Sequence, residues 1–109
     1  MLILETHAFT RRIVELLSDE HYAQHYAQLQ ADLVDRPDAG RLIRGTGGLR
    51  KIRWAAKGHG KRGGVRVICY WYVRGEQLLM LLVYPKEEQD DLSERQRRIL
   101  RKIVEDEYP

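Results

Sequence analysis

Residues 45–73 read GTGGLRKIRWAAKGHGKRGGVRVICYWYV, and this stretch decides the fold. Apolar and charged residues alternate from Leu49 to Ala55, and Val65 to Val73 is rich in β-branched and aromatic residues. Both patterns are typical of strands, in which successive side chains point to opposite faces. A basic, glycine-rich segment from Lys57 to Gly64 joins them. The pattern predicts two consecutive antiparallel strands, with one face of the first formed by Leu49, Lys51, Arg53 and Ala55.

Helical periodicity dominates the first third of the chain. A short strand over Leu2–Leu4 precedes a predicted helix over Ala8–Leu17. Ser18 or Asp19 is a suitable N-cap for a second helix, and Pro37 with Gly40 ends it. The apolar side of this second helix consists of Tyr22, Tyr26, Leu29 and Leu33.

The remaining elements follow from the same rules. Leu42-Ile43 is a candidate short strand, and residues 45–48 form a turn. Leu78–Tyr84 is almost continuously apolar, which predicts a central strand that is covered on both faces. Ser93 and Gln96 have the spacing of a capping box, and the helix that follows has apolar positions at Ile99, Leu100, Ile103 and Val104.

The predicted fold is α+β, with residues 1–109 forming a single domain. Two N-terminal helices pack on one face of an antiparallel meander of about four strands. A short N-terminal strand is added to this sheet, and a helix ends the chain. We expect Trp54, Cys69 and Trp71 in the core beneath the helices. The opposite face is then left for Lys51, Arg53 and Arg66.

Charge is distributed unevenly along the chain. The net charge is only +3, yet residues 39–75 contain no Asp or Glu and hold ten of the 19 Lys and Arg residues. All nine glycines fall in the same window. A block of one sign within a mixed-charge protein attracts polyanions such as nucleic acids. A solvated basic face is the alternative, and it is weakened because the charges sit among strand-forming residues.

Composition disfavours several classes of protein. Cys69 is the single cysteine, so neither an intramolecular disulfide nor a cysteine-based zinc site is expected. No apolar run approaches the roughly 18 residues that span a bilayer, and the first residues lack a signal-peptide pattern. His21 and His25 have the i, i+4 spacing of metal ligands, but further ligands are missing. We therefore expect a cytoplasmic protein without metal, cofactor or membrane association.

One family of toxins resembles this chain over nearly its whole length. The HigB branch of the RelE/ParE superfamily typically carries G-T-G-G-L-R-K-I-R, a glycine-lysine-arginine loop, and G-G-x-R before an aromatic strand. These elements match Gly45–Arg53, the loop from Lys57, and Gly63–Arg66. Tyr84-Pro85-Lys86 is similar to the Y-x-K element of that branch, and Asp91-Leu92-Ser93 is similar to the start of its last helix.

The resemblance implies a RelE-like fold, whose sheet carries a basic concave face. It also implies the toxin of a type II toxin–antitoxin system, a ribosome-dependent endoribonuclease (mRNA interferase) that cleaves messenger RNA in the ribosomal A site and inhibits translation. The implied partners are a HigA-like helix-turn-helix antitoxin, the ribosome with its 16S ribosomal RNA, and mRNA in a bacterial cytoplasm. The family's catalytic positions fall on Lys51, Arg53, Arg66, Tyr84 and Lys86.

Metal-free cleavage is chemically reasonable because RNA supplies its own nucleophile, the 2′-hydroxyl. A lysine acts as a base where packed cations disfavour its charged form, and we assign this role to Lys51. Arg66 is assigned as the main phosphate clamp, because a guanidinium matches phosphate oxygens bidentately. Arg53 is a second clamp and a candidate proton donor to the leaving group. Tyr84 would orient the nucleophile or stack on a base, and Lys86 would add positive charge.

Each assignment has a structural alternative. Lys51 and Arg53 have the spacing of an ordinary solvent-facing pair on a strand. Arg66 would otherwise pair with an acid across the sheet, although residues 39–75 supply no acid nearby in sequence. Tyr84 fits a packing role at the edge of the sheet almost as well as a catalytic role.

The basic loop and the residues around it are expected to bind RNA. The candidates for binding messenger or ribosomal RNA are Arg50, Lys57, His59, Lys61 and Arg62. The family usually has lysine where this chain has His59, which puts one backbone contact in doubt and introduces a group that titrates near neutrality. A flexible hairpin tip is the alternative for this loop.

Two other functions fit the same fold. ParE-like relatives inhibit DNA gyrase, but they generally lack the basic catalytic set. A non-catalytic RNA-binding module would bind RNA with a steep salt dependence and leave messengers intact.

Overall fold

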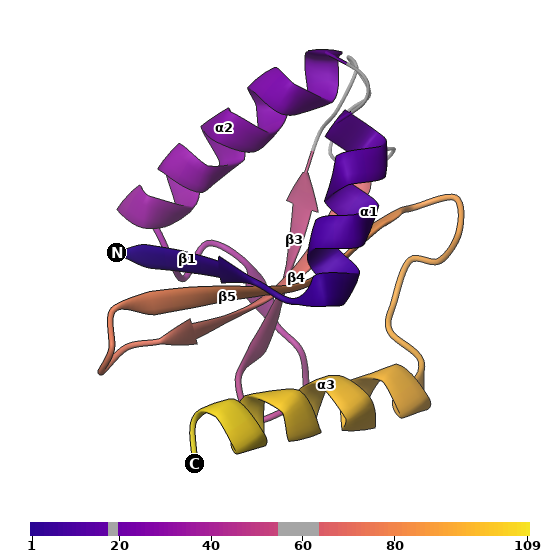
Figure 1. Cartoon of the computed structure of the whole chain (residues 1–109). Helices are drawn as coiled ribbons and strands as arrows, with labels where there is room; N and C mark the ends of the chain where they lie inside the picture. Colours follow the sequence, from indigo (N-terminus) through magenta and orange to yellow (C-terminus); the bar gives the residue numbers. More distant parts are fainter. Residues whose placement is uncertain (18–19, 55–63) are drawn as a thin grey trace.

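The computed structural model describes residues 1–17, 20–54 and 64–109 (Figure 1). Strand β1 (Leu2–Glu5) leads into helix α1 (His7–Leu17), and helix α2 (Glu20–Asp35) follows. The chain then forms β2 (Arg41–Leu42), β3 (Leu49–Trp54), β4 (Val65–Tyr72) and β5 (Gln77–Pro85), and helix α3 (Glu94–Glu107) comes last. The predicted α+β class is confirmed. The proposed caps Ser18 and Asp19 lie outside the described residues.

The strands form one five-stranded sheet in the order β1-β5-β4-β3-β2. The predicted meander is present, because β3, β4 and β5 pair antiparallel in sequence order. The two-residue strand β2 pairs with β3 at one edge, one residue earlier than the sequence predicts. At the other edge β1 pairs parallel with β5. Strand β5 therefore lies inside the sheet, as its continuous apolar sequence predicts.

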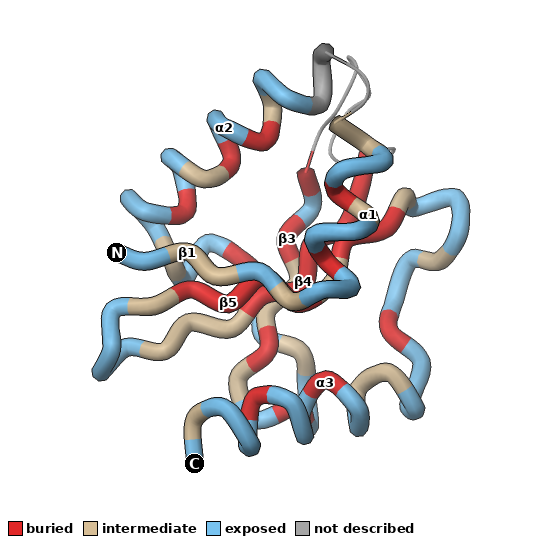
Figure 2. Tube along the Cα trace, in the orientation of Figure 1, coloured by how far each residue is buried: buried red, intermediate tan, exposed pale blue. Residues whose placement is uncertain are grey.

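Helices pack on both faces of this sheet, with α1 and α2 on one side and α3 on the other (Figure 1). The core beneath α1 and α2 includes Phe9, Leu33, Trp54, Val67 and Cys69. The second core brings Leu100 and Val104 of α3 against Leu49, Ile68 and Leu81 of the sheet. Figure 2 shows the result, in which both faces of the central strands are buried and the outer sides of the helices are exposed.

The last helix differs from expectation in two respects. Ile99 and Ile103 are 49% and 37% exposed, so only Leu100 and Val104 of the predicted apolar set are buried. The face opposite α1 and α2 is also not left entirely to basic residues, because α3 covers the half of it around Leu49 and Ile68. The physical reason is that this half is itself apolar and requires cover.

The start of α3 is well defined. The hydroxyl of Ser93 accepts a hydrogen bond from the backbone N–H of Gln96 at 3.1 Å, and the Gln96 amide oxygen accepts from the N–H of Ser93 at 2.9 Å. This confirms the predicted capping box.

Among the described residues, no helix combines the length and the apolar character that a membrane crossing requires.

A β-bulge between β4 and β5 decides which β5 side chain lies beside the basic residues Lys51, Arg53 and Arg66 of the sheet. The pairing of β4 with β5 shifts by one residue between Ile68 and Cys69. Beyond the shift Arg66 is paired with Tyr84, whereas an unbroken register would pair it with Val83. Accordingly, Val83 packs in the core beneath α1 and α2, and Tyr84 packs in the core on the α3 side.

Candidate active site

The register of three neighbouring strands gathers the predicted catalytic residues. Arg66 of β4 is paired with Arg53 of β3 on one side and with Tyr84 of β5 on the other. Lys51 precedes Arg53 by two positions on β3 and therefore faces the same way. Lys86 is exposed and lies just beyond β5, outside the strand pairing that brings the other residues together. Four of the five predicted catalytic residues thus share one face.

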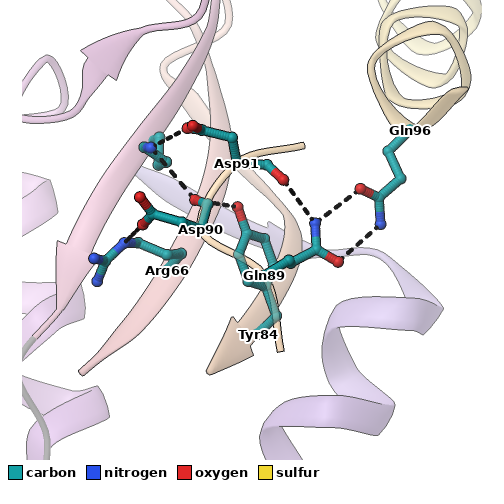
Figure 3. Close-up of polar contacts among 7 residues, drawn as sticks. Arg66, Tyr84, Gln89, Asp90, Asp91 and Gln96 are labelled. Carbon is teal, nitrogen blue, oxygen red and sulfur yellow. Dashed lines mark hydrogen bonds and ion pairs between the residues drawn. The ribbon is translucent and has the colours of Figure 1, made fainter. Parts of the chain in front are cut away.

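Asp90 connects three of these four residues (Figure 3). Its carboxylate Oδ1 accepts a hydrogen bond from Nε of Arg66 at 3.1 Å. Its backbone carbonyl accepts from the hydroxyl of Tyr84 and from Nζ of Lys51, both at 3.4 Å. The neighbouring Asp91 accepts from the same Lys51 amine through Oδ1 at 2.5 Å. The site is therefore a set of cations and one phenol arranged around two consecutive carboxylates.

Arg66 pairs with an acid, as its structural alternative allowed, although residues 39–75 contain none, and sequence analysis missed both Asp90 and Asp91 as site residues. The window without acids ends at residue 75, but the segment between β5 and α3 folds back over the basic strands. A signal was present, because the match to a helix start at Asp91-Leu92-Ser93 places two adjacent acids just after β5. An acid-free stretch of sequence need not be acid-free in space.

Burial differs sharply between the partners in these ion pairs. The Arg66 side chain is 1% exposed and that of Lys51 is 11% exposed, whereas the Asp90 and Asp91 side chains are 51% and 69% exposed. The cations therefore lie underneath, and the carboxylates form the outer layer. A ligand approaching from solvent would meet the two aspartates before it met either cation.

The electrostatics of the site fix two protonation states. The hydrogen bond and the charge of Lys51 lower the pKa of Asp91, and the charges of Arg97 and Arg53 lower it further. Asp91 is therefore a carboxylate at neutral pH. Burial raises the pKa of Tyr84 to about 12, the charge of Asp91 raises it too, and the charge of Arg66 opposes the shift. Tyr84 is thus a neutral phenol that can donate a hydrogen bond.

The segment that carries the two aspartates is anchored at both ends. The amides of Gln89 and Gln96 bond reciprocally at 2.9 and 3.3 Å, and Gln89 also donates to the backbone carbonyl of Asp91 at 3.1 Å (Figure 3). Glu88 forms an ion pair with Arg12 of α1. The backbone at Asp91 is therefore held between α1 and α3 and positions its carboxylate on Lys51.

The predicted RNA-binding set is only partly described. Arg50 lies on the opposite face of β3 from Lys51, and its Nη1 donates to the carbonyls of Gly40 and Asp38 at 2.8 and 3.2 Å. These bonds hold the turn before β2. The other four candidates lie outside the described residues and stay predictions: Lys57, His59, Lys61 and Arg62. Within the described ranges, no group of three His, Cys, Asp or Glu residues is placed to hold a metal ion.

Comparison with known proteins identifies the family and the fold of this chain. The model of the family described as RelE toxin of the RelE/RelB toxin–antitoxin system matches residues 1–107. The isolated Escherichia coli RelE toxin is similar in structure, with a TM-score of 0.60 and 12% identity over 94% of this chain and 97% of that chain. A mutant of E. coli RelE in the free state gives a TM-score of 0.58 and 14% identity over 82% and 86%.

At such low identity the structural likeness shows the fold alone, whereas the family match covers nearly every residue. The nearer resemblance to the HigB branch stays a prediction from the motifs. The chain belongs to the RelE toxin family, the toxin component of a toxin–antitoxin system.

Proposed function

We propose that this RelE-family toxin is a ribosome-dependent endoribonuclease that cleaves messenger RNA in the ribosomal A site and thereby inhibits translation. The observation that carries the proposal is the convergence of Lys51, Arg66 and Tyr84 on Asp90, with Arg53 paired beside them. Preorganised cations and hydrogen-bond donors of this kind stabilise the charge that develops on a phosphorane. A sheet face that served packing alone would have no need of three cations.

The proposed reaction uses the 2′-hydroxyl of the RNA as nucleophile. Lys51 takes the proton of that hydroxyl as a neutral amine, after it has given up one proton to solvent and no longer donates to Asp91. Arg53, which is exposed, binds the phosphate oxygens from the solvent side. Arg66 is held in orientation by Asp90 and stabilises the phosphorane from beneath.

The remaining predicted residues have supporting roles. Tyr84 donates a hydrogen bond that orients the nucleophile, since its phenol is neutral at working pH. Lys86 adds positive charge at the end of β5. Arg53 is also the candidate donor of a proton to the leaving 5′-oxygen. Acid–base assistance of this kind contributes about 10²- to 10⁴-fold in rate.

The proposed partners follow from charge and family. The acid-free window from residue 39 to residue 75 has the composition of a surface that binds the backbone of 16S ribosomal RNA and of the messenger. As a member of a toxin–antitoxin family, the chain is proposed to bind a HigA-like helix-turn-helix antitoxin in a bacterial cytoplasm.

The test is to map cleavage sites on a messenger in a reconstituted translation system, with and without ribosomes. Wild type is compared with Lys51→Ala, Arg66→Ala and the control Arg74→Ala, which removes an exposed cation from the same window. We expect cuts only with ribosomes, their loss in the first two variants, and full activity in the control. Intact messengers with wild type, or full cleavage by both site variants, would contradict the proposal. Inhibition of gyrase by wild type in a supercoiling assay would point to the ParE-like function instead.

A further inference from the structure

Asp91 lies at an unusual place for an exposed carboxylate. Its Oδ1 is 2.5 Å from Nζ of Lys51, and it covers an amine whose side chain is only 11% exposed. The same amine is 3.4 Å from the backbone carbonyl of Asp90. In the ion pair of Asp91 with Lys51, the carboxylate therefore faces solvent and the amine lies beneath it. A molecule from solution can reach the place that the carboxylate occupies.

Arg97 adds a cation that sequence analysis did not single out. It lies in the first turn of α3, directly after Gln96, whose amide binds Gln89 of the segment that carries Asp91. Its Nε atom is buried and has no hydrogen-bond partner among the described residues. The charges of Arg97 and Arg53 both act on the Asp91 carboxylate. Asp91 thus lies among cations from two different elements, β3 and α3.

We propose that in the free toxin Asp91 occupies the place of an RNA phosphate, and that Lys51, Arg53 and Arg97 form the phosphate-binding site that Asp91 vacates. Carboxylate and phosphate oxygens accept the same charge-assisted hydrogen bonds from ammonium and guanidinium groups, so one can replace the other. The inference rests on the proposed function for the identity of the ligand, a phosphodiester of single-stranded RNA. It adds Arg97 to the residues that contact the substrate.

The neighbouring Asp90 is not the residue that leaves. Asp90 is bonded to Arg66, which is 1% exposed, and its departure would remove a partner from a buried guanidinium. The Asp91 side chain is 69% exposed, and Lys51 keeps the backbone carbonyl of Asp90 as an acceptor when the Asp91 carboxylate leaves. Asp90 is therefore a positioning residue for Arg66, and Asp91 is the replaceable anion.

The exchange needs only a rotation of the Asp91 side chain. The backbone carbonyl of Asp91 is held by Gln89, and the capping box fixes the chain two residues later at Ser93. The segment can therefore stay in place while the carboxylate turns out to solvent. The same rotation exposes the Lys51 amine to the incoming phosphodiester, so the departure of Asp91 and the access of RNA to Lys51 are coupled.

The test is an equilibrium binding measurement with a fluorescent 2′-O-methyl RNA hexamer, which lacks the nucleophile and cannot be cleaved. The full-length variant Asp91→Asn is compared with Glu87→Gln, which changes the net charge equally at an exposed position of the same segment. Arg97→Gln is compared with Arg98→Gln, its exposed neighbour on α3. Circular dichroism confirms that each variant is folded, and Arg97→Met, which removes the charge but keeps a long side chain, replaces Arg97→Gln if that variant does not fold.

We expect Asp91→Asn to tighten binding at least fivefold and Glu87→Gln less than twofold. Arg97→Gln should weaken binding at least fivefold and reduce the slope of log K against log salt by about 0.7, the value of one phosphate contact on a single strand. Equal effects of Asp91→Asn and Glu87→Gln, or of Arg97→Gln and Arg98→Gln, would overturn the inference. If this binding pattern holds but wild type cuts no messenger on ribosomes, the phosphate site stands and the nuclease function fails.

Discussion

Nε of Arg66 donates a hydrogen bond to Oδ1 of Asp90 at 3.1 Å, from a side chain that is 1% exposed. The two residues are separated by 24 positions in sequence, and they join the middle strand of the basic face to the segment before α3. A buried guanidinium requires partners that compensate its charge. Asp90 supplies one of them, so this contact bears on both the stability of the fold and the geometry of the site.

Replacing Asp90 should therefore destabilise the protein. Asp90→Ala removes one acceptor from a buried charge, and we expect the free energy of unfolding to fall by about 1–3 kcal/mol. Asp90→Asn keeps an acceptor oxygen and should lose less. Urea denaturation measures both variants, with Glu87→Ala as a surface control that should change stability by about 0.5 kcal/mol or less. A loss for Asp90→Ala no larger than that of the control would show that other partners suffice for Arg66.

Lys51→Arg separates proton transfer from charge. Arginine keeps the positive charge and the bond to Asp91, but it does not serve as a base near neutrality. We expect messenger cleavage on ribosomes to fall by about 10²- to 10⁴-fold with little change in stability. Lys102→Arg, the same substitution at an exposed position of α3, is the control and should be fully active. Normal cleavage by Lys51→Arg would remove Lys51 as the base and leave it a role in binding.

Tyr84 should act as a proton-bearing phenol at every physiological pH. The pKa of Tyr84 is raised to about 12, so its ionisation should cause no rise or fall in the wild-type cleavage rate between pH 6 and 9. Tyr84→Phe should lower the rate about tenfold or more while the shape of that profile is unchanged. Tyr72→Phe is the control on the neighbouring strand. A changed profile in Tyr84→Phe would mean that the phenol ionises during the reaction.

The raised pKa of Tyr84 also affects the stability of the protein at high pH. The pKa of Tyr84 is higher in the folded protein than its ordinary value of 10.0, so the folded state holds the proton more tightly. The contribution of Tyr84 to stability is complete below pH 10 and is lost as the pH rises toward 12. Thermal denaturation of Tyr84→Phe should therefore depend less on pH in this range than that of wild type. If the melting temperatures of Tyr84→Phe and wild type depended on pH in the same way, the pKa of Tyr84 would not be raised in the folded protein.

Cys69 should be inert in the folded protein. Its side chain is fully buried, and burial raises the pKa of the thiol to about 12, although the charge of Arg50 opposes the shift. The reactive thiolate is therefore scarce and inaccessible. A chromogenic disulfide reagent at pH 8 should label the native protein only as fast as it opens, and label it at once in concentrated guanidinium chloride. Rapid labelling without denaturant would contradict the burial of Cys69.

Local periodicity was sufficient for most of the fold. The alternation of Leu49, Lys51 and Arg53 against Ile52 and Trp54 assigned each side chain of β3 to the face on which it lies. Ser93 and Gln96 located the start of α3 because a capping box depends on residues three apart. The continuous apolar run of β5 indicated a strand inside the sheet. Each of these features is set by neighbours along the chain, which the sequence displays directly.

Ile99 and Ile103 show where that reasoning stops, since both fit the helical pattern of α3 and both are exposed. Only the packing of α3 against Leu49 and Ile68 decided which part of its apolar stripe is buried. The bulge between Ile68 and Cys69 likewise placed Tyr84, rather than Val83, beside Arg66. No local pattern specifies this shift, because it depends on how two strands fit against two different cores.

The sequence by itself determined that Lys51, Arg53 and Arg66 carry a concentrated positive charge on the strands of an α+β fold. The tertiary structure alone decided that Asp90 and Asp91 cover those charges, across separations of 24 and 40 residues. The physical reason is that the first feature depends on neighbouring residues and the second on residues far apart in the chain. Side-chain alternation is fixed by the backbone of a single strand, whereas an ion pair between distant residues depends on the path of the whole chain, here on a segment held between α1 and α3.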